Sequence, residues 1–307
     1  MRAILLVLVL AAGSVSGQDA PDLKQLQDQY QKALQAKDYE KAIALATDVA
    51  ALQAQPYLET LCDVAALQLK LGRRDEAYEW LEKVERTGLG DAFALRRDER
   101  FTAIRTEERF VALMRRIRSV SYIEMLERPE RDAFQKPDQV MAALALRPGE
   151  RVADVGAGSG YFTFRLARAV GPSGSVLACD TWQEMLDHIA KRMAKENPGN
   201  IRLVKVTPED PALPPGGLDT ILMVDTLHYV KDKPAYARTL ARSLATGGRV
   251  VIIDYIPRPM AERPWGPPPE QQFSREELDA AMAAGGLHPV KVHTFLPEQF
   301  FVEYCLR

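Results

Sequence analysis

The stretch Arg151-Val152-Ala153-Asp154-Val155-Gly156-Ala157-Gly158-Ser159-Gly160-Tyr161 decides the fold class of the second half of the chain. A short apolar run, residues 151–155, leads directly into a loop with glycine at every second position, and an amphipathic helix pattern follows. Glycine permits positive φ angles and lets a ligand approach the backbone closely. In an open α/β sheet, ligands bind beyond the carboxyl ends of the strands. The stretch therefore predicts a strand, a ligand-binding loop and a helix.

The spacing of the glycines narrows the class of ligand. The dinucleotide fingerprint needs a third glycine three positions after the second, and that position is Tyr161. A nicotinamide-dependent reductase therefore stays a weaker hypothesis. A P-loop is excluded because no Gly-Lys-Ser/Thr follows. Asp180 ends the next apolar run, 20 residues beyond Gly160, where a carboxylate can accept both hydroxyl protons of a ribose. The alternative for Asp180 is a helix N-cap or a solvated turn.

Further short apolar runs alternate with helical or loop segments after residue 149. We predict strands at residues 151–155, 176–179, 201–206, 218–224, 249–254, 290–295 and 300–306. This alternation is typical of a parallel sheet with helices on both faces. Thr181 and Ser274 are each followed three positions later by glutamate, which predicts a capping box at two helix starts. The fold class predicted is a Rossmann-like, seven-stranded α/β sheet, mostly parallel, with an antiparallel terminal hairpin.

Residues 152–254 resemble class I S-adenosylmethionine-dependent methyltransferases of the ubiquinone/menaquinone-biosynthesis type. Four features match in order: the glycine loop, Asp180 after the second strand, residues 218–225 as the fourth strand, and Thr246-Gly247-Gly248 before the fifth. The terminal hairpin is similar to that fold's antiparallel seventh strand, which is inserted beside the fifth.

The resemblance implies S-adenosylmethionine as the cofactor and a set of residues that bind it. The loop glycines would face the methionine part, Asp154 would help to hold the amino group, and Asp180 would bind the ribose. Residues 207–210 would flank the adenine, and Asp225 would lie near the sulfonium and the acceptor. The complete set is Asp154, Gly156, Ala157, Gly158, Gly160, Asp180, Thr207, Glu209 and Asp225.

Reaction-specific residues are expected after the fourth strand, at Asp225-Thr226-Leu227-His228-Tyr229. If the acceptor must lose a proton, His228 is the natural base, and we take His228 and Asp225 as the catalytic candidates. The alternative is that His228 orients the cofactor loop through a hydrogen bond. The remaining histidines and the three cysteines lack metal-ligand spacing, so no metal is expected.

Residues 257–269 contain six prolines, which exclude a helix or a central strand in this segment. Because this segment follows the fifth strand, it emerges on the same side of the sheet as the glycine loop. We interpret it as a semi-rigid rim over the acceptor pocket, with Trp265 as a contact. The alternative is a structural excursion that only covers the sheet.

The first part of the chain is helical by pattern. Lys37-Asp38-Tyr39-Glu40-Lys41-Ala42 and Arg73-Arg74-Asp75-Glu76-Ala77 each open an alanine-containing helix after another amphipathic helix. The two alanines are 35 positions apart, close to the tetratricopeptide period of 34. We predict a tetratricopeptide-like helical domain over residues 18–118, with a cap helix at 105–117. A connector of short pieces at 119–148 and the methyltransferase domain at 149–307 follow.

Residues 1–17 have the order of a secretory signal peptide: a positive start, an apolar run and small residues before Gln18. An uncleaved membrane anchor and a cytoplasmic chain are the alternatives. Export conflicts with the supply of S-adenosylmethionine, which is scarce outside the cytoplasm.

The charge balance of 40 basic and 42 acidic residues gives a net charge of −2 and no nucleic-acid footprint. The leading hypothesis is methyl transfer to a small-molecule or protein acceptor, with a protein partner on the helical repeats. The competing hypothesis is an exported tetratricopeptide-type adaptor whose methyltransferase-like domain is inactive.

Overall fold

The computed structural model describes residues 23–52, 58–259, 261–263 and 266–306. The chain forms two compact units that divide between Tyr122 and Ile123. Residues 1–17, the predicted signal peptide, and Trp265 lie outside the described residues. None of the described helices is both long enough and apolar enough to span a bilayer.

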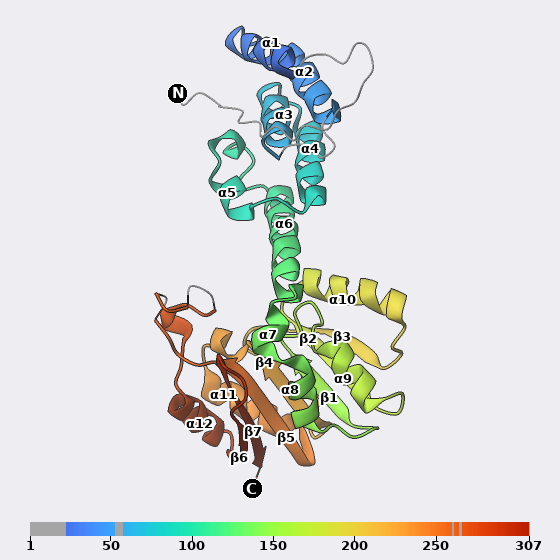
Figure 1. Ribbon diagram of the computed structural model, residues 1–307, viewed down its shortest axis with the longest axis vertical. Helices are drawn as coiled ribbons and strands as arrows, with labels where there is room; N and C mark the ends of the chain where they lie inside the picture. Colours follow the sequence, from blue (N-terminus) through green and yellow to red (C-terminus); the bar gives the residue numbers. More distant parts are fainter. Residues whose placement is uncertain (1–22, 53–57, 260, 264–265, 307) are drawn as a thin grey trace. The chain divides into compact units, whose positions relative to one another are not determined.

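The first unit consists of successive helices (Figure 1). They are α1 (Leu23–Gln35), α2 (Tyr39–Leu52), α3 (Leu58–Lys70), α4 (Arg74–Thr87), α5 (Ala92–Arg97), the 3₁₀ turn η1 (Glu99–Phe101) and α6 (Glu108–Glu127). Helix α1 packs against α2, α2 against α3, and α3 against α4. Ala42 and Ala77, the two alanines of the predicted repeats, have no exposed surface. Arg100 forms ion pairs with Asp63 and Asp98 and so ties α3 to the segment after α5.

Helix α6 is longer than the cap helix predicted at residues 105–117. It begins at Glu108 and ends at Glu127, because the chain offers no glycine or proline between Gly90 and Pro129 to stop it. Short pieces follow only from Pro129 onward: α7 (Arg131–Gln135) and α8 (Pro137–Leu144). Pro137 occupies the first turn of α8, where its missing N–H costs nothing.

The second unit contains one seven-stranded sheet in the order β3-β2-β1-β4-β5-β7-β6. Its strands are β1 (Arg151–Val155), β2 (Ser175–Asp180), β3 (Ile201–Lys205), β4 (Leu218–Val224), β5 (Leu244–Tyr255), β6 (Leu287–His293) and β7 (Gln299–Leu306). The first five strands pair in parallel, and β7 lies antiparallel between β5 and β6. The predicted Rossmann-like sheet and its inserted terminal strand are therefore confirmed. Thr246-Gly247-Gly248, expected before the fifth strand, lies within β5, next to a register shift against β4.

Two hydrophobic cores cover the two faces of this sheet (Figure 1). Helices α8, α9 (Thr163–Val170) and α10 (Gln183–Glu196) pack on one face, and α11 (Lys233–Ser243) and α12 (Arg275–Ala283) pack on the other. Neighbouring residues of a strand alternate between the cores, as Ile221 and Leu222 do in β4. Burial on both faces explains why these strands read as continuous apolar runs.

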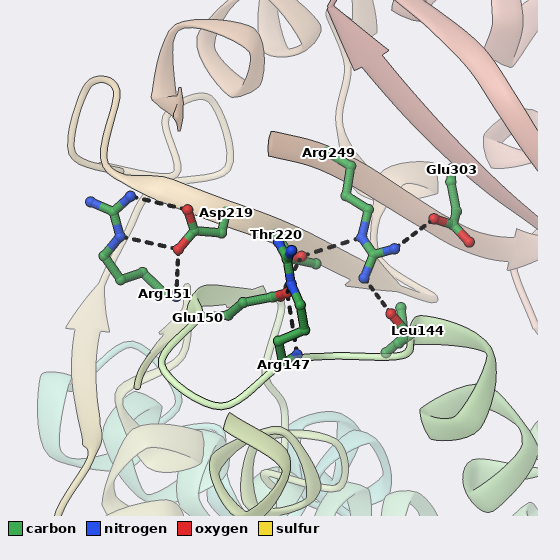
Figure 2. Close-up of polar contacts among 8 residues, drawn as sticks. All are labelled: Leu144, Arg147, Glu150, Arg151, Asp219, Thr220, Arg249 and Glu303. Carbon is green, nitrogen blue, oxygen red and sulfur yellow. Dashed lines mark hydrogen bonds and ion pairs between the residues drawn. The ribbon is translucent and has the colours of Figure 1, made fainter. Parts of the chain in front are cut away.

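Polar side chains fix the amino ends of the central strands, at the end opposite the glycine loop (Figure 2). Arg151 pairs with Asp219 at 3.1 Å and so joins β1 to β4. Arg249 of β5 pairs with Glu303 of β7 at 2.8 Å and also donates to the Leu144 carbonyl of α8. These contacts hold the strands in register, so that their carboxyl ends meet in one place.

Candidate functional site

The glycine loop is tied to the end of β2. The amides of Gly156 and Ala157 donate to the Cys179 carbonyl at 2.8 and 3.0 Å. Gly156, Gly158 and Gly160 have φ angles of 79°, 54° and 83°, a region that other residues enter only with strain. The sequence prediction that this loop requires glycine for its backbone conformation is confirmed.

The space beside each loop glycine is filled by another part of the protein. A Cβ on Gly156 would lie 2.2 Å from Thr226 Oγ1, and one on Gly158 would lie 3.0 Å from Leu126 Cδ1. At Gly160 the nearest atoms belong to Ile189 and Phe164. Close packing of this loop against its neighbours therefore requires glycine. The cofactor contacts implied for these positions stay a prediction.

Asp180 lies at the end of β2 and joins the loop to the next helix. One carboxylate oxygen accepts from the Gly158 amide at 2.8 Å, and the other accepts from the Trp182 amide at 2.8 Å. Burial raises the pKa of this carboxyl group, and the backbone amides oppose that rise. The capping box predicted at Thr181 is wrong. Helix α10 begins at Gln183 with Trp182 as its N-cap residue and no side-chain cap, so Thr181 lies one residue before the position that a capping box requires.

Asp154 lies at the end of β1 and is 3% exposed. Thr163, in the first turn of α9, donates to its carboxylate at 2.6 Å. Burial raises the pKa of Asp154 to about 6, with Asp180 adding to the rise and the Thr163 bond and Arg131 opposing it. Two carboxylates thus end adjacent parallel strands, with the glycine loop between them.

Asp225 follows β4 and has a φ of 51°, which is strained for a residue other than glycine. Gln299 of β7 donates to its carboxylate, and Gln299 in turn accepts from Gln135 of α7 at 3.0 Å. Burial raises the pKa of Asp225 to about 6, and the nearby Asp254 carboxylate adds to the rise. The Tyr255 hydroxyl also bonds to this carboxylate. A carboxylate held at a strained position by uncharged hydrogen-bond partners is available to a cationic ligand.

His228 is buried and paired with Asp254, a residue that the sequence analysis did not identify. The ring Nδ1 lies 2.8 Å from one Asp254 oxygen, and the His228 backbone amide donates to the other at 3.2 Å. The Tyr255 amide also donates to Asp254, at 2.9 Å. The His228 ring centroid lies 4.1 Å from that of Tyr229 and 6.1 Å from that of Tyr255. His228 is therefore fixed in orientation by a carboxylate, as a general base requires.

Thr207 and Glu209 lie in an exposed turn after β3. The Thr207 amide donates to the Asp210 carbonyl at 3.2 Å, and the Asp210 amide donates to Thr207 Oγ1 at 3.1 Å. The turn stands at the carboxyl end of the sheet, but no contact joins Thr207 or Glu209 to Asp154, Asp180 or Asp225 within the part of the chain that the structure describes.

The proline-rich segment contains no strand among its described residues, and its one helical element is the 3₁₀ turn η3 (Pro269–Gln271). The Gln272 side chain accepts from the Arg258 amide at 2.9 Å and donates back to the Arg258 carbonyl at 3.0 Å. Together with α12, the segment borders a cavity of about 480 Å³. The cavity is lined by Pro257, Arg258, Pro259, Pro269, Gln272, Phe273, Ser274 and Glu277. The predicted capping box at Ser274 and Glu277 is present.

Sequence reasoning missed Thr163, Gln299, Asp254 and Arg131. Only Thr163 left a local signal, because it follows Asp154 by nine positions at the start of the next helix. The others reach the site from distant strands or from α7. Among the described residues, no group of three or more His, Cys, Asp or Glu side chains is placed to hold a metal.

Comparison with known proteins agrees with this geometry. Residues 152–248 match the family model described as "Methyltransferase domain". The chain is 31% identical to nocamycin O-methyltransferase of Saccharothrix syringae over 47% of this chain and 51% of that protein. It is 32% identical to the ubiquinone/menaquinone biosynthesis C-methyltransferase of Vibrio campbellii over 36% of this chain and 42% of that protein. The chain thus spans about half the length of these relatives, or less.

A solved structure supports the same assignment. The crystal structure of a SAM-dependent methyltransferase from Aquifex aeolicus aligns with a TM-score of 0.55 and 28% identity. The alignment covers 60% of this chain and 96% of that protein. The part of the chain that contains residues 152–248 is therefore a class I S-adenosylmethionine-dependent methyltransferase domain.

Proposed function

We propose that the whole chain acts as an S-adenosylmethionine-dependent methyltransferase on an acceptor that loses a proton during transfer. The observation that carries the proposal is the set of three carboxylates around the glycine loop: Asp154 and Asp180, which are buried, and Asp225, which is half-buried. Buried carboxylates with raised pKa values are costly unless a cation binds beside them. S-adenosylmethionine carries two positive groups, a sulfonium and an ammonium, so these carboxylates fit it as a ligand.

The residues would hold the cofactor as the family resemblance implies. Asp154 would hold the amino group, Asp180 the ribose hydroxyls, and Thr207 with Glu209 the adenine edge. The bound cofactor supplies an electrophilic methyl group. The chain contributes position, because Asp225 and the loop are both fixed to the ends of neighbouring strands.

The His228–Asp254 pair is the proposed base of the site. When Asp254 accepts from Nδ1, the other ring nitrogen keeps its lone pair and can take a proton. The two relatives are named for transfer to oxygen and to carbon, and both an O–H and an acidic C–H need a base. The acceptor is a small molecule or a protein side chain, and the cavity under the proline-rich segment is its proposed entrance.

Calorimetry and labelling test the proposal together. The purified chain should bind S-adenosylmethionine and S-adenosylhomocysteine but not a nicotinamide dinucleotide. With methyl-labelled cofactor and a lysate, mass spectrometry should find a labelled product. His228→Gln should bind the cofactor within about threefold of wild type and transfer the methyl group 10²–10⁴ times more slowly, the usual contribution of a general base. Tight dinucleotide binding without a response to S-adenosylhomocysteine would overturn the proposal.

We also propose that helices α1 to α4 are tetratricopeptide-like hairpins that bind a protein partner. Support comes from their sequential packing and from Ala42 and Ala77 at equivalent buried positions. An adaptor with an inactive domain is the competing function, and it predicts cofactor binding without any labelled product.

Export is the proposal for the first 17 residues. Intact mass of the native protein should place the mature N-terminus at or near Gln18. A mature chain that keeps Met1 and fractionates with the cytoplasm would remove the export proposal and the problem of cofactor supply.

A further inference from the structure

The cofactor of the proposed function carries a carboxylate besides its two cationic groups. The three aspartates repel that carboxylate, so a site built only from them leaves it without a partner. A cationic side chain at the glycine loop would supply that partner, and the resemblance implied none.

Arg131, the first residue of α7, is a buried cation at this loop. It is 8% exposed. Its guanidinium lies 4.0 Å from the ring centroid of Tyr161, which directly follows Gly160. Its Nη1 donates to the Leu126 carbonyl at 2.9 Å, and the Leu126 side chain is the one that lies against Gly158. Arg131 thus contacts Tyr161 directly and is linked to Gly158 through Leu126.

The surroundings of Arg131 place it between the ends of β1 and β4. Its charge lowers the pKa of Asp154 and of Asp225, opposing the rise that burial causes in both. Helix α7 is held there by two further contacts: the Tyr161 hydroxyl donates to Asp132, and Gln135 donates to Gln299, which donates to Asp225.

The hydrogen bonds of Arg131 leave one edge of its guanidinium open to a ligand. An arginine has five N–H donors, and the Leu126 bond is the one that Arg131 makes to the described residues, none of which forms an ion pair with it. Nε and Nη2 remain, and these two donors bind a carboxylate in bidentate fashion. Two other arginines lie near the loop: Arg192 is paired with Glu127 and Glu196, and Arg165 donates to the Tyr161 carbonyl at 2.6 Å.

We propose that Arg131 binds the methionine carboxylate of S-adenosylmethionine through Nε and Nη2. This assignment rests on the proposed function. It makes α7 part of the cofactor site: the helix supplies the cation, and the strand ends supply the carboxylates that hold the cofactor's own cationic groups.

The test compares S-adenosylmethionine with decarboxylated S-adenosylmethionine, which keeps the sulfonium and the amine. Calorimetry on the full chain should show that Arg131→Ala weakens binding of S-adenosylmethionine about 10- to 100-fold, the loss typical of a charge-assisted bidentate pair. Binding of the decarboxylated compound should change less than threefold. Arg131→Lys should recover part of the loss. Arg165→Ala is the matched control, because Arg165 also lies over the Tyr161 ring, at 4.4 Å, and should bind both compounds as wild type does.

Two results would overturn the assignment alone: equal weakening for both compounds, or wild-type affinity of Arg131→Ala for S-adenosylmethionine. If Arg131→Ala does not fold, Arg131→Lys takes its place, and equal affinity changes for both compounds again overturn the assignment. A wild-type chain that binds neither compound overturns the proposed function, and the role of Arg131 with it.

Discussion

Asp154 is buried and Asp225 is half-buried. Their hydrogen bonds come from uncharged side chains, Thr163 for Asp154 and Gln299 with Tyr255 for Asp225. Their pKa values of about 6 place their titration just below neutral pH. A folded-state pKa above the unfolded value means that the native state binds these protons more tightly. The stability that these protons contribute is complete below the unfolded pKa near 4 and is lost as the pH rises through 6. At neutral pH the ionised pair is therefore destabilising unless a cation binds.

Cofactor binding should depend on this titration. A cationic ligand favours the ionised carboxylates, so affinity for S-adenosylmethionine should rise as the pH increases through 6 and level off above 7. Each carboxylate that must lose its proton should contribute about a tenfold change per pH unit below 6. Calorimetry between pH 5 and 8, in buffers of different ionisation enthalpy, should detect proton release. Asp225→Asn should reduce the slope and should not lower the melting temperature at pH 7.5. A flat affinity profile contradicts this prediction.

Asp180 has a structural role through its bonds to the Gly158 and Trp182 amides, in addition to the ribose-binding role that we propose. Asp180→Ala should weaken cofactor binding by about 1.5–3 kcal/mol through the loss of charge-assisted bonds. The change also leaves the buried amides of Gly158 and Trp182 without their acceptor, so unfolding should become easier by about 1–3 kcal/mol. Urea denaturation and calorimetry separate the two effects. Unchanged cofactor binding in a strongly destabilised variant would restrict Asp180 to structure.

At the scale of elements, local pattern predicted the strands well and their side-chain partners poorly. The sequence pattern identified all seven strands, because a strand that is buried on both faces appears in the sequence as a continuous apolar run. The capping box predicted at Thr181 is absent because α10 begins one residue later than the pattern indicated, with Trp182 as its N-cap residue. Asp254 was missed because it meets His228 only when β4 and β5 are paired, across 26 positions of sequence.

The glycine loop offers a matched test of packing against strain. Gly160 and Gly216 both have positive φ, but a Cβ on Gly160 would lie 3.0 Å from Ile189 and from Phe164, whereas Gly216 has nothing within 4 Å. Gly216→Ala should cost about 1 kcal/mol for strain alone. Gly160→Ala should cost a further 1–3 kcal/mol for overpacking. Chemical denaturation measures both, and equal losses would show that the contacts of Gly160 adapt freely.

At the scale of the whole molecule, the chain is two compact units with one helix, α6, running through the division between them. At residue 149 the hydrophobic pattern changes from helical periodicity to short apolar runs, and this change predicted two regions. It did not predict that α6 would continue to Glu127, because helix propensity places no end on a segment without a breaker.

In limited proteolysis, we expect the first cut in the exposed turn after α6. Glu127 to Glu130 are exposed, and a glutamate-specific protease should cut there before it cuts at Glu262 or Glu270. The latter two lie in the proline-rich segment that Gln272 ties to Arg258. Mass spectrometry of early fragments distinguishes the sites. First cleavage within α1 to α4 would show that the helical unit is not compact.

The position of β7 has a consequence for biosynthesis. β7 follows the other six strands along the chain, yet it pairs with β5 and with β6 and separates them. During translation, β1 to β5 emerge while the far edge of β5 still exposes unpaired amides and carbonyls, a template for pairing between nascent chains. The edge of β5 is paired only when residues 299–306, which form β7, have left the ribosome. Premature termination before Gln299 should therefore yield aggregated chains that chaperones retain, even though every residue of the glycine loop has been made.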